Sequence, residues 1–135
     1  MTNKELLSIM GREGNARFWE DGDYKCVVHR HRIMGHLNGY VGLPKGHAWF
    51  GKGYEDIEVD VHGGLTYASE YMITNPEKDG RWWIGFDTAH LGDITIFLND
   101  PDEIQAFCGE TYKDMTYVIS EVKNLLKQAK EKSNN

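Results

Sequence analysis

Two compact blocks carry most of the residues that can do chemistry. The first is Asp-Val-His-Gly-Gly-Leu-Thr-Tyr at residues 60–67, and the second is Arg-Trp-Trp-Ile-Gly-Phe-Asp-Thr-Ala-His-Leu-Gly-Asp at residues 81–93. Each block starts with the pattern of a strand and runs into glycine, histidine and carboxylate residues. The blocks therefore predict one sheet end at which aromatic faces, imidazoles and acids meet, which is an arrangement typical of a small-molecule site.

The glycine pair beside His62 is the sharpest feature of the first block. Gly63 and Gly64 would give up side-chain packing inside a strand, so they mark either a bulge or the close approach of another backbone or of a ligand. A purely structural bulge stays open as the alternative. The predicted ligand-binding residues of this block are Asp60, His62, Gly63, Gly64 and Tyr67.

The second block contains two consecutive tryptophans. Neighbouring strand residues point to opposite faces, so Trp82 shares a face with Ile84 and Phe86, and Trp83 lies on the other face. We expect Trp83 to be accessible to a ligand, and the alternative is that it packs under a second layer. The predicted ligand-binding residues of this block are Trp83, Asp87 and His90.

A third segment, residues 42–53, is rich in glycine and aromatic residues and predicts an ordered loop. Its backbone N–H groups and its lysines could meet a phosphate while an aromatic ring stacks on a base. The spacing matches no phosphate-binding fingerprint, and an aromatic plug over the core explains it equally well. The predicted ligand-binding residues here are Lys45, His47, Trp49 and Phe50.

Metal and nucleophile chemistry are weaker possibilities. His29 and His31 would share one face of a strand, and a metal site can be drawn from them with the Asp87-x-x-His90-x-x-Asp93 triplet. None of the spacings matches a recognised metal motif, so we expect no metal and no cofactor. We also expect no catalytic nucleophile, because the chain has no Gly-x-Ser-x-Gly elbow and no cysteine beside a histidine in sequence.

Composition narrows the class of protein. A chain of 135 residues, with 40% hydrophobic and 27% charged residues, predicts one globular domain. It has no apolar run long enough for a membrane span and no secretory signal, so we expect a cytoplasmic protein that does not bind membranes. The net charge of −6 disfavours general nucleic-acid binding. Cys26 and Cys108 lie far apart in the sequence and are expected to be free buried thiols.

The expected elements give an α+β fold, a mainly antiparallel sheet with a long C-terminal helix packed on one face and a short N-terminal helix. The first helix is capped at Thr2 and ends at Gly11 and Gly14, and a strand over residues 24–33 turns at Asn38-Gly39. Strands over 58–67 and 81–87 form a hairpin, and residues 94–98 add a further strand. A capping box at Thr111 opens the last helix, whose apolar stripe is Met115, Val118, Ile119, Val122, Leu125, Leu126 and Ala129.

Residues 35–41, 62–67 and 82–93, together with the closing helix from Tyr112, resemble a family of small phage and prophage proteins. Small phage proteins of this kind include immune-evasion factors that sequester nucleotide second messengers of bacterial defence systems such as Thoeris and CBASS. By analogy, the resemblance implies a cyclic ADP-ribose-type or cyclic-oligonucleotide ligand that is bound in the bacterial host cell without turnover. Under it Arg30, Arg32 and Lys45 would meet phosphates, and Asp60 and Asp87 would accept hydrogen bonds from ribose hydroxyls.

Two other functions stay open. One is a hydrolase that acts on a nucleotide-like signal through His62, Asp87 and His90, with or without a metal. The other is an inhibitor that binds a host protein through its tryptophans and acidic surface. Exposed tryptophan and tyrosine are frequent at interfaces, so a homo-oligomer is one further expectation that the sequence does not fix.

Overall fold

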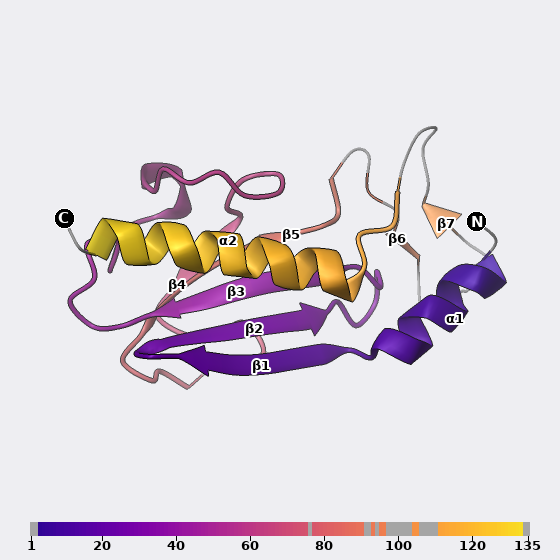
Figure 1. Cartoon of the computed structure of the whole chain (residues 1–135), viewed down its shortest axis with the longest axis horizontal. Coiled ribbons are helices and arrows are strands. Elements are labelled where there is room, and N and C mark those ends of the chain that lie inside the picture. The colour runs from indigo at the N-terminus through magenta and orange to yellow at the C-terminus, as the bar shows by residue number, and fades with distance from the viewer. Residues whose placement is uncertain are drawn as a thin grey trace.

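The computed structural model describes residues 3–75, 77–90, 93, 95–96, 104–105 and 111–133. Two helices, a short 3-10 turn and seven strands lie within these ranges (Figure 1). In chain order they are α1 (Asn3–Glu13), β1 (Ala16–Asp21), β2 (Tyr24–Arg30), β3 (Leu37–Leu43), η1 (Tyr54–Asp56), β4 (Tyr67–Ser69), β5 (Trp82–Asp87), β6 (Thr95–Ile96), β7 (Ile104–Gln105) and α2 (Met115–Ser133).

The main sheet has five strands in the order β1-β2-β3-β5-β4, and every neighbouring pair is antiparallel. Helix α2 lies lengthwise across one face of this sheet, and α1 lies beyond the end at which β1 begins (Figure 1). The predicted α+β class is confirmed. The short strands β6 and β7 pair with each other and form a separate two-stranded sheet.

The apolar stripe of α2 forms the main core with the sheet, as its helical spacing predicts. All of its predicted members are buried except Ile119, which is partly buried against the same core. The helix comes close at Gly39 of β3, where a Cβ atom would lie 2.5 Å from Cγ2 of Val122 and 2.6 Å from Cζ of Phe86. Gly39 is therefore a contact between helix and sheet rather than a turn residue, and the turn predicted at Asn38-Gly39 lies instead over residues 31–36, between β2 and β3.

The opposite face of the sheet, which we call the open face, carries a smaller core of Val27, Tyr40, Met72 and Trp83. Trp82 and Trp83 lie on opposite faces, as predicted, and Trp82 packs with Ile84 and Phe86 in the main core. Met72 belongs to the segment between β4 and β5, so that segment forms part of a second layer over Trp83.

The strand predicted over residues 58–67 is wrong except at its last residue, Tyr67, where β4 begins and pairs with β5. The backbone of this segment finds its partners on α2 instead of on a strand. The N–H of Asp60 donates to Oε1 of Gln128, and the carbonyl of Asp60 accepts from the side chains of Asn124 and Gln128. Since these polar groups are satisfied by helix side chains, the segment needs no neighbouring strand.

The ends of the helices also differ from expectation. Helix α1 continues through Gly11 to Glu13, and Gly14 follows it with a φ of +80°. Helix α2 begins at Met115 and is capped by Asp114, whose Oδ1 accepts from the N–H of Tyr117 at 2.8 Å. Thr2 and most of the strand predicted at 94–98 lie outside the described residues. No helix within the described residues is long and apolar enough to cross a membrane.

Candidate functional site

The two chemical blocks meet at the end of the sheet where β3 begins and β5 ends, close to the start of α2 (Figure 1). We call this region the histidine end and define it by His36, His62, His90, Asp87 and Asp93. The glycine-rich loop predicted over residues 42–53 follows the other end of β3, beyond Leu43. The histidine end and the 42–53 loop are therefore separate places in the fold.

A chain of hydrogen-bonding groups runs through His62. Nε2 of His62 lies 2.9 Å and 3.1 Å from the two carboxylate oxygens of Asp93, and Nδ1 lies 2.7 Å from the hydroxyl of Tyr117. The backbone N–H of His62 donates to Oε1 of Glu121 at 2.9 Å, which fixes the segment against α2. With Asp93 accepting from Nε2–H, Nδ1 is the ring nitrogen that accepts a proton. We call this arrangement the Asp93–His62–Tyr117 chain.

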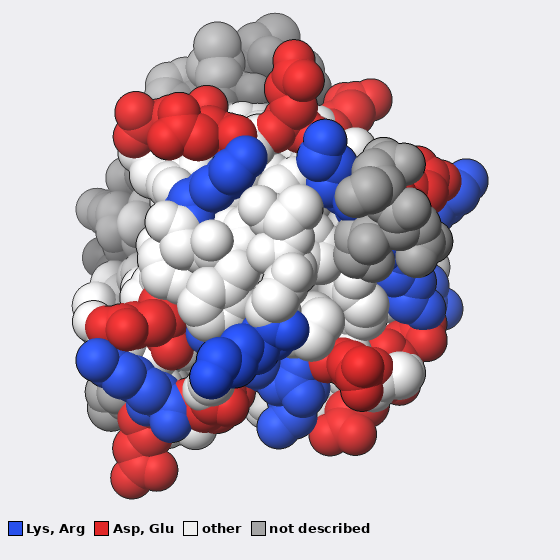
Figure 2. Space-filling view, turned by 90° about the vertical axis from the view of Figure 1, so that its left-hand side faces the viewer, with Lys and Arg blue, Asp and Glu red and all other residues white. Residues whose placement is uncertain are grey.

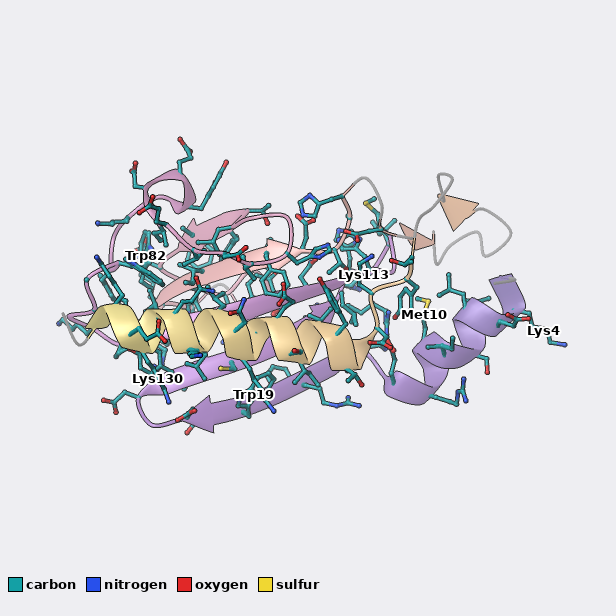
Figure 3. The ribbon with its side chains drawn as sticks, turned by 45° about the horizontal axis from the view of Figure 1, so that its top comes forward. Lys4, Met10, Trp19, Trp82, Lys113 and Lys130 are labelled. Atoms are coloured by element: carbon teal, nitrogen blue, oxygen red, sulfur yellow. The ribbon has the colours of Figure 1, made fainter. Side chains whose placement is uncertain are left out.

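Asp93 is a buried carboxylate that is held in its charged form. It accepts hydrogen bonds from His62 and from the backbone N–H of His90 at 3.0 Å, and it forms an ion pair with Lys113 at 3.1 Å. Burial alone would raise the pKa of Asp93, but these contacts outweigh burial and hold it below its ordinary value. Figure 3 shows Lys113 just before the start of α2, where it faces this end of the sheet.

His90 explains the first glycine of the pair. Gly63 has a φ of +67°, and a Cβ atom there would lie 2.3 Å from Nε2 of His90. The close approach predicted at the pair is therefore made by an imidazole side chain. Nε2 of His90 is buried and lies 3.0 Å from Oδ1 of Asp87, but the angles are outside those of a hydrogen bond. We treat this contact as electrostatic.

Tyr117 closes the chain on the solvent side. It is 36% exposed, and burial together with the charges of Glu121 and Asp93 raises the pKa of its phenol. Tyr117 is therefore a neutral proton donor rather than a nucleophile. Asp93 is placed to stabilise an imidazolium form of His62, because it accepts a hydrogen bond from Nε2–H.

The predicted residues of the 42–53 loop have structural contacts. Nε2 of His47 lies 2.7 Å from the carbonyl of Ala129 near the end of α2, and its Nδ1 accepts from the N–H of Trp49 at 2.9 Å. Trp49 is in the main core, as the alternative of an aromatic plug requires, and Phe50 packs on Trp82 with ring centroids 5.8 Å apart. This corrects the assignment of His47 and Trp49 to a ligand, because both are buried in the fold.

Lys45 lies exposed at the same far end, beside Asp79 and Arg81. Figure 2 looks onto this end of the molecule and shows lysine and arginine side chains interspersed with acidic ones around an uncharged area. Figure 3 shows Trp82 and Lys130 toward this same end of α2. The basic residues of the loop are thus not brought to the two chemical blocks.

Arg30 is buried in β2 and holds α1 and its following turn to the sheet. All five of its N–H groups donate within the fold, and the acceptors are Asn15, Gly35, Tyr112, Glu13 and Gly14. No N–H is left for a phosphate, which corrects the contact implied for Arg30. Arg32 is exposed in the turn after β2, and His31, which was expected on that strand, follows its end and stacks on His36.

The remaining predicted residues divide between the two faces. Asp60 has an exposed side chain beside α2, and Gly64 has open space around it. Tyr67 contacts Tyr40 on the open face with ring centroids 5.6 Å apart. Trp83 is buried beneath Met72 and donates from its indole N–H to Asp79, so the alternative of a second layer is correct. Trp83 still lines a cavity of about 430 Å³ on the open face.

Sequence reasoning missed the helix residues that complete the site. Tyr117 and Glu121 lie four residues apart and off the apolar stripe of α2, so they share a face beside it. That spacing was a signal, but nothing in the sequence indicates that His62 packs against this face. Lys113 was missed because nothing in the sequence indicates that it lies beside Asp93.

Cys26 is a free, buried thiol, as predicted, and burial raises its pKa to about 11. Cys108 and Gly92 lie outside the described residues. Within the part of the chain that the structure describes, no group of three or more His, Cys, Asp or Glu side chains is placed to hold a metal ion. Comparison of the chain with models of protein families, with curated proteins and with solved structures finds no match.

Proposed function

We propose that the histidine end is a small-molecule site at which His62 performs acid–base chemistry, so that the chain acts as a small hydrolase. The observation that carries this proposal is the Asp93–His62–Tyr117 chain. It combines a buried carboxylate, an imidazole with a defined tautomer and a partly exposed proton donor in one hydrogen-bonded series. A buried carboxylate of lowered pKa that is bonded to an imidazole is an arrangement that clusters at functional sites.

In this proposal Nδ1 of His62 takes a proton from a water molecule as the oxygen of that water bonds to the electrophilic atom of the ligand, and the imidazolium gives the proton to the leaving group when the scissile bond breaks. Nε2–H keeps its hydrogen bond to Asp93, whose negative charge stabilises the imidazolium that forms. The hydroxyl of Tyr117 now lies 2.7 Å from Nδ1 of His62, and the reacting group replaces it as the hydrogen-bond partner of Nδ1. Lys113 keeps Asp93 ionised during this step.

The charges around the site favour an uncharged polar group next to His62. Asp87, Asp93 and Glu121 are acids, and Lys113 is paired with Asp93. Such surroundings suit a hydroxyl group better than a phosphate, which acids repel. For a nucleotide-type ligand, we therefore expect a ribose hydroxyl at His62 and the phosphates toward solvent. The resemblance to small phage proteins makes nucleotide second messengers the first ligands to test.

The second candidate function is sequestration of such a signal without turnover, by a phage protein inside its bacterial host. The observation that favours it is the closure of the site, since both ring nitrogens of His62 and both carboxylate oxygens of Asp93 are already engaged within the fold. A binding protein benefits from such rigid side chains because little entropy is lost when the ligand binds.

One experiment separates the two candidates. The purified protein is incubated with cyclic ADP-ribose isomers and cyclic dinucleotides, binding is detected by thermal shift, and the ligand is identified after denaturation. A ligand at about a hundredfold excess over Kd stabilises the fold by about 2.7 kcal/mol. Recovery of a cleaved product supports the hydrolase, and recovery of intact ligand supports sequestration. If no ligand shifts the melting temperature, both proposals fail and the protein-binding inhibitor is favoured.

His62→Gln is the decisive variant. We expect it to lower turnover about 100-fold or more while ligand affinity changes little, because glutamine keeps a polar side chain but cannot cycle a proton. The matched control is His29→Gln, which changes a half-buried histidine of β2 outside the Asp93–His62–Tyr117 chain. Equal turnover by His62→Gln and the control would overturn the role of His62.

A further inference from the structure

A second cavity lies on the open face of the sheet, on the side away from α2. It has a volume of about 330 Å³, and its polar lining includes His31, His36, Asn38, Tyr40, Tyr67 and Asp87. Asn38 and Asp87 are opposite each other in the register of β3 and β5, so they form a polar row across the sheet. Only Tyr67 and Asp87 of this set belong to the residues that the sequence predicted.

Two buried polar atoms of residues that line this cavity have no hydrogen-bond partner among the described residues. They are Nδ1 of His36 and Oδ1 of Asn38. His36 is only 5% exposed, and burial lowers its pKa to about 4, so its ring is neutral at pH 7. A buried polar atom that lacks a hydrogen bond costs about 1–3 kcal/mol, which a bound molecule with matching groups would recover once a small side-chain rotation turns these atoms into the cavity.

Asp87 offers a third hydrogen-bonding position. Its contacts with the N–H of Ala89 and with His90 are both made by Oδ1. Oδ2 accepts no hydrogen bond from the described residues, so it can accept one from a ligand. Together with Asn38 and His36, the cavity presents acceptors and one neutral imidazole along a single edge.

Aromatic rings form the walls beside this polar edge. His31 stacks on His36 with ring centroids 5.0 Å apart and an angle of 20° between the planes. Tyr40 and Tyr67 meet edge to face above Gly85, where a Cβ atom would lie 2.4 Å from Cδ1 of Tyr40. Flat walls of this kind favour a flat ligand, because aromatic faces pack best on other rings.

We propose that this cavity binds a small, uncharged, planar heterocycle that carries hydrogen-bond donors, such as a purine base or its nucleoside. The volume is at the lower end of the range of about 300–1,000 Å³ for ligand cavities, which suits a single heterocycle rather than a dinucleotide. Two of the lining residues, His36 and Asp87, also belong to the histidine end. The proposal is still independent of turnover at His62, because His62, Asp93 and Tyr117 do not line this cavity.

The test is calorimetric titration of the purified chain with adenosine, guanosine, inosine and cytidine. The variants are His36→Leu and Asn38→Leu, which remove the two unpaired atoms, and His29→Leu is the matched control on the same face. His29 is opposite Asn38 in the register of β2 and β3 but does not line the cavity. Circular dichroism checks that each variant folds. If His36→Leu does not fold, the affinity of Asn38→Leu decides the outcome.

We expect a purine nucleoside to bind, with a Kd about tenfold higher in Asn38→Leu and His36→Leu and nearly unchanged in His29→Leu. With histidine ring nitrogens labelled by ¹⁵N, the Nδ1 signal of His36 should shift when the nucleoside is added. Absence of binding by all four nucleosides, or binding by both cavity variants that is as tight as that of the unchanged chain, overturns the proposal. The nucleoside titration measures no turnover, so it can fail or succeed separately from the proposed hydrolase, whose test is the turnover of His62→Gln.

Discussion

Gly63 and Gly64 have similar backbone angles but different surroundings. Their φ values are +67° and +81°, a region in which residues with a Cβ atom are strained. At Gly63 a Cβ atom would also meet the ring of His90, whereas at Gly64 nothing lies within 4 Å. The pair therefore separates the cost of backbone strain from the cost of displacing a site residue.

We predict that Gly64→Ala lowers the free energy of unfolding by about 1–2 kcal/mol and that Gly63→Ala lowers it by at least about 1 kcal/mol more. The reason is that a Cβ atom at position 63 pushes against the ring of His90, whereas one at position 64 meets nothing. Urea denaturation of both variants measures the difference. Equal losses of stability would show that His90 moves away at no cost and would contradict a rigid histidine end.

At the scale of residues, the sequence predicted three members of the histidine end but not His36, Asp93 or the partners from α2. Residue type and strand pattern indicated that His62, Asp87 and His90 gather at one sheet end, and the distances agree. The lysine and aromatic loop was assigned to the same ligand because residue types carry no information about strand direction. Since β3 runs away from the histidine end, its loop lies at the other end.

At the scale of elements, the start of α2 depends on one side chain. Oδ1 of Asp114 accepts from the N–H of Tyr117, and its carbonyl accepts from the N–H of Val118. This first turn also carries Tyr117 to His62, so the cap positions part of the candidate site. The sequence placed the cap three residues too early because Thr111 and Asp114 fit the capping-box spacing.

We predict that Asp114→Ala lowers the free energy of unfolding by about 1 kcal/mol, whereas Asp114→Asn lowers it by only a few tenths. Asparagine keeps the side-chain oxygen that caps the N–H of Tyr117, and alanine does not. Thermal unfolding of the two variants checks the difference. Similar losses in both would indicate that the negative charge near the helix N-terminus matters more than the cap oxygen.

The elements that the sequence predicted well are those whose pattern reflects their own core contacts. The stripe of α2 follows directly from burial on one face, and the alternation in β5 separates the residues of the main core from Trp83 in the core of the open face. The segment at 58–67 shows the same alternation, with Val61 buried and Val59 and Leu65 partly buried, yet its backbone is bonded to side chains of Asn124 and Gln128. Alternation reports which side chains are buried, and it does not report what satisfies the backbone.

At the scale of the whole molecule, the sheet has two unequal layers. The main core lies under α2, and a smaller core under Met72 covers part of the open face. The sequence predicted the helix layer but not how β5 is inserted between β3 and β4, because parity identifies the two faces of a strand and not its neighbours. That insertion places Asp87 opposite Asn38 and so creates the polar row beside His36.

His36 links this arrangement to the pH dependence of stability. Burial lowers its pKa from 6.5 to about 4, with His31 and His90 acting in the same direction and Asp87 and Asp93 opposing them. Between these two values the unfolded chain binds a proton that the folded chain does not. The contribution of His36 to stability is therefore complete above about pH 6.5 and is lost as the pH falls toward about 4.

We predict that the chain loses about 2–3 kcal/mol more stability than the variant His36→Gln between about pH 7 and about pH 4.5, because glutamine does not titrate. Urea denaturation of both proteins at the two pH values measures this difference, and the carboxylates and other histidines contribute equally to both. Asp93 acts in a lower window, since its pKa is held below 3.8. An equal loss of stability in the two proteins would mean that the ring of His36 reaches solvent when it is protonated. The cavity beside His36 would then be too open to bind an uncharged heterocycle at its polar edge.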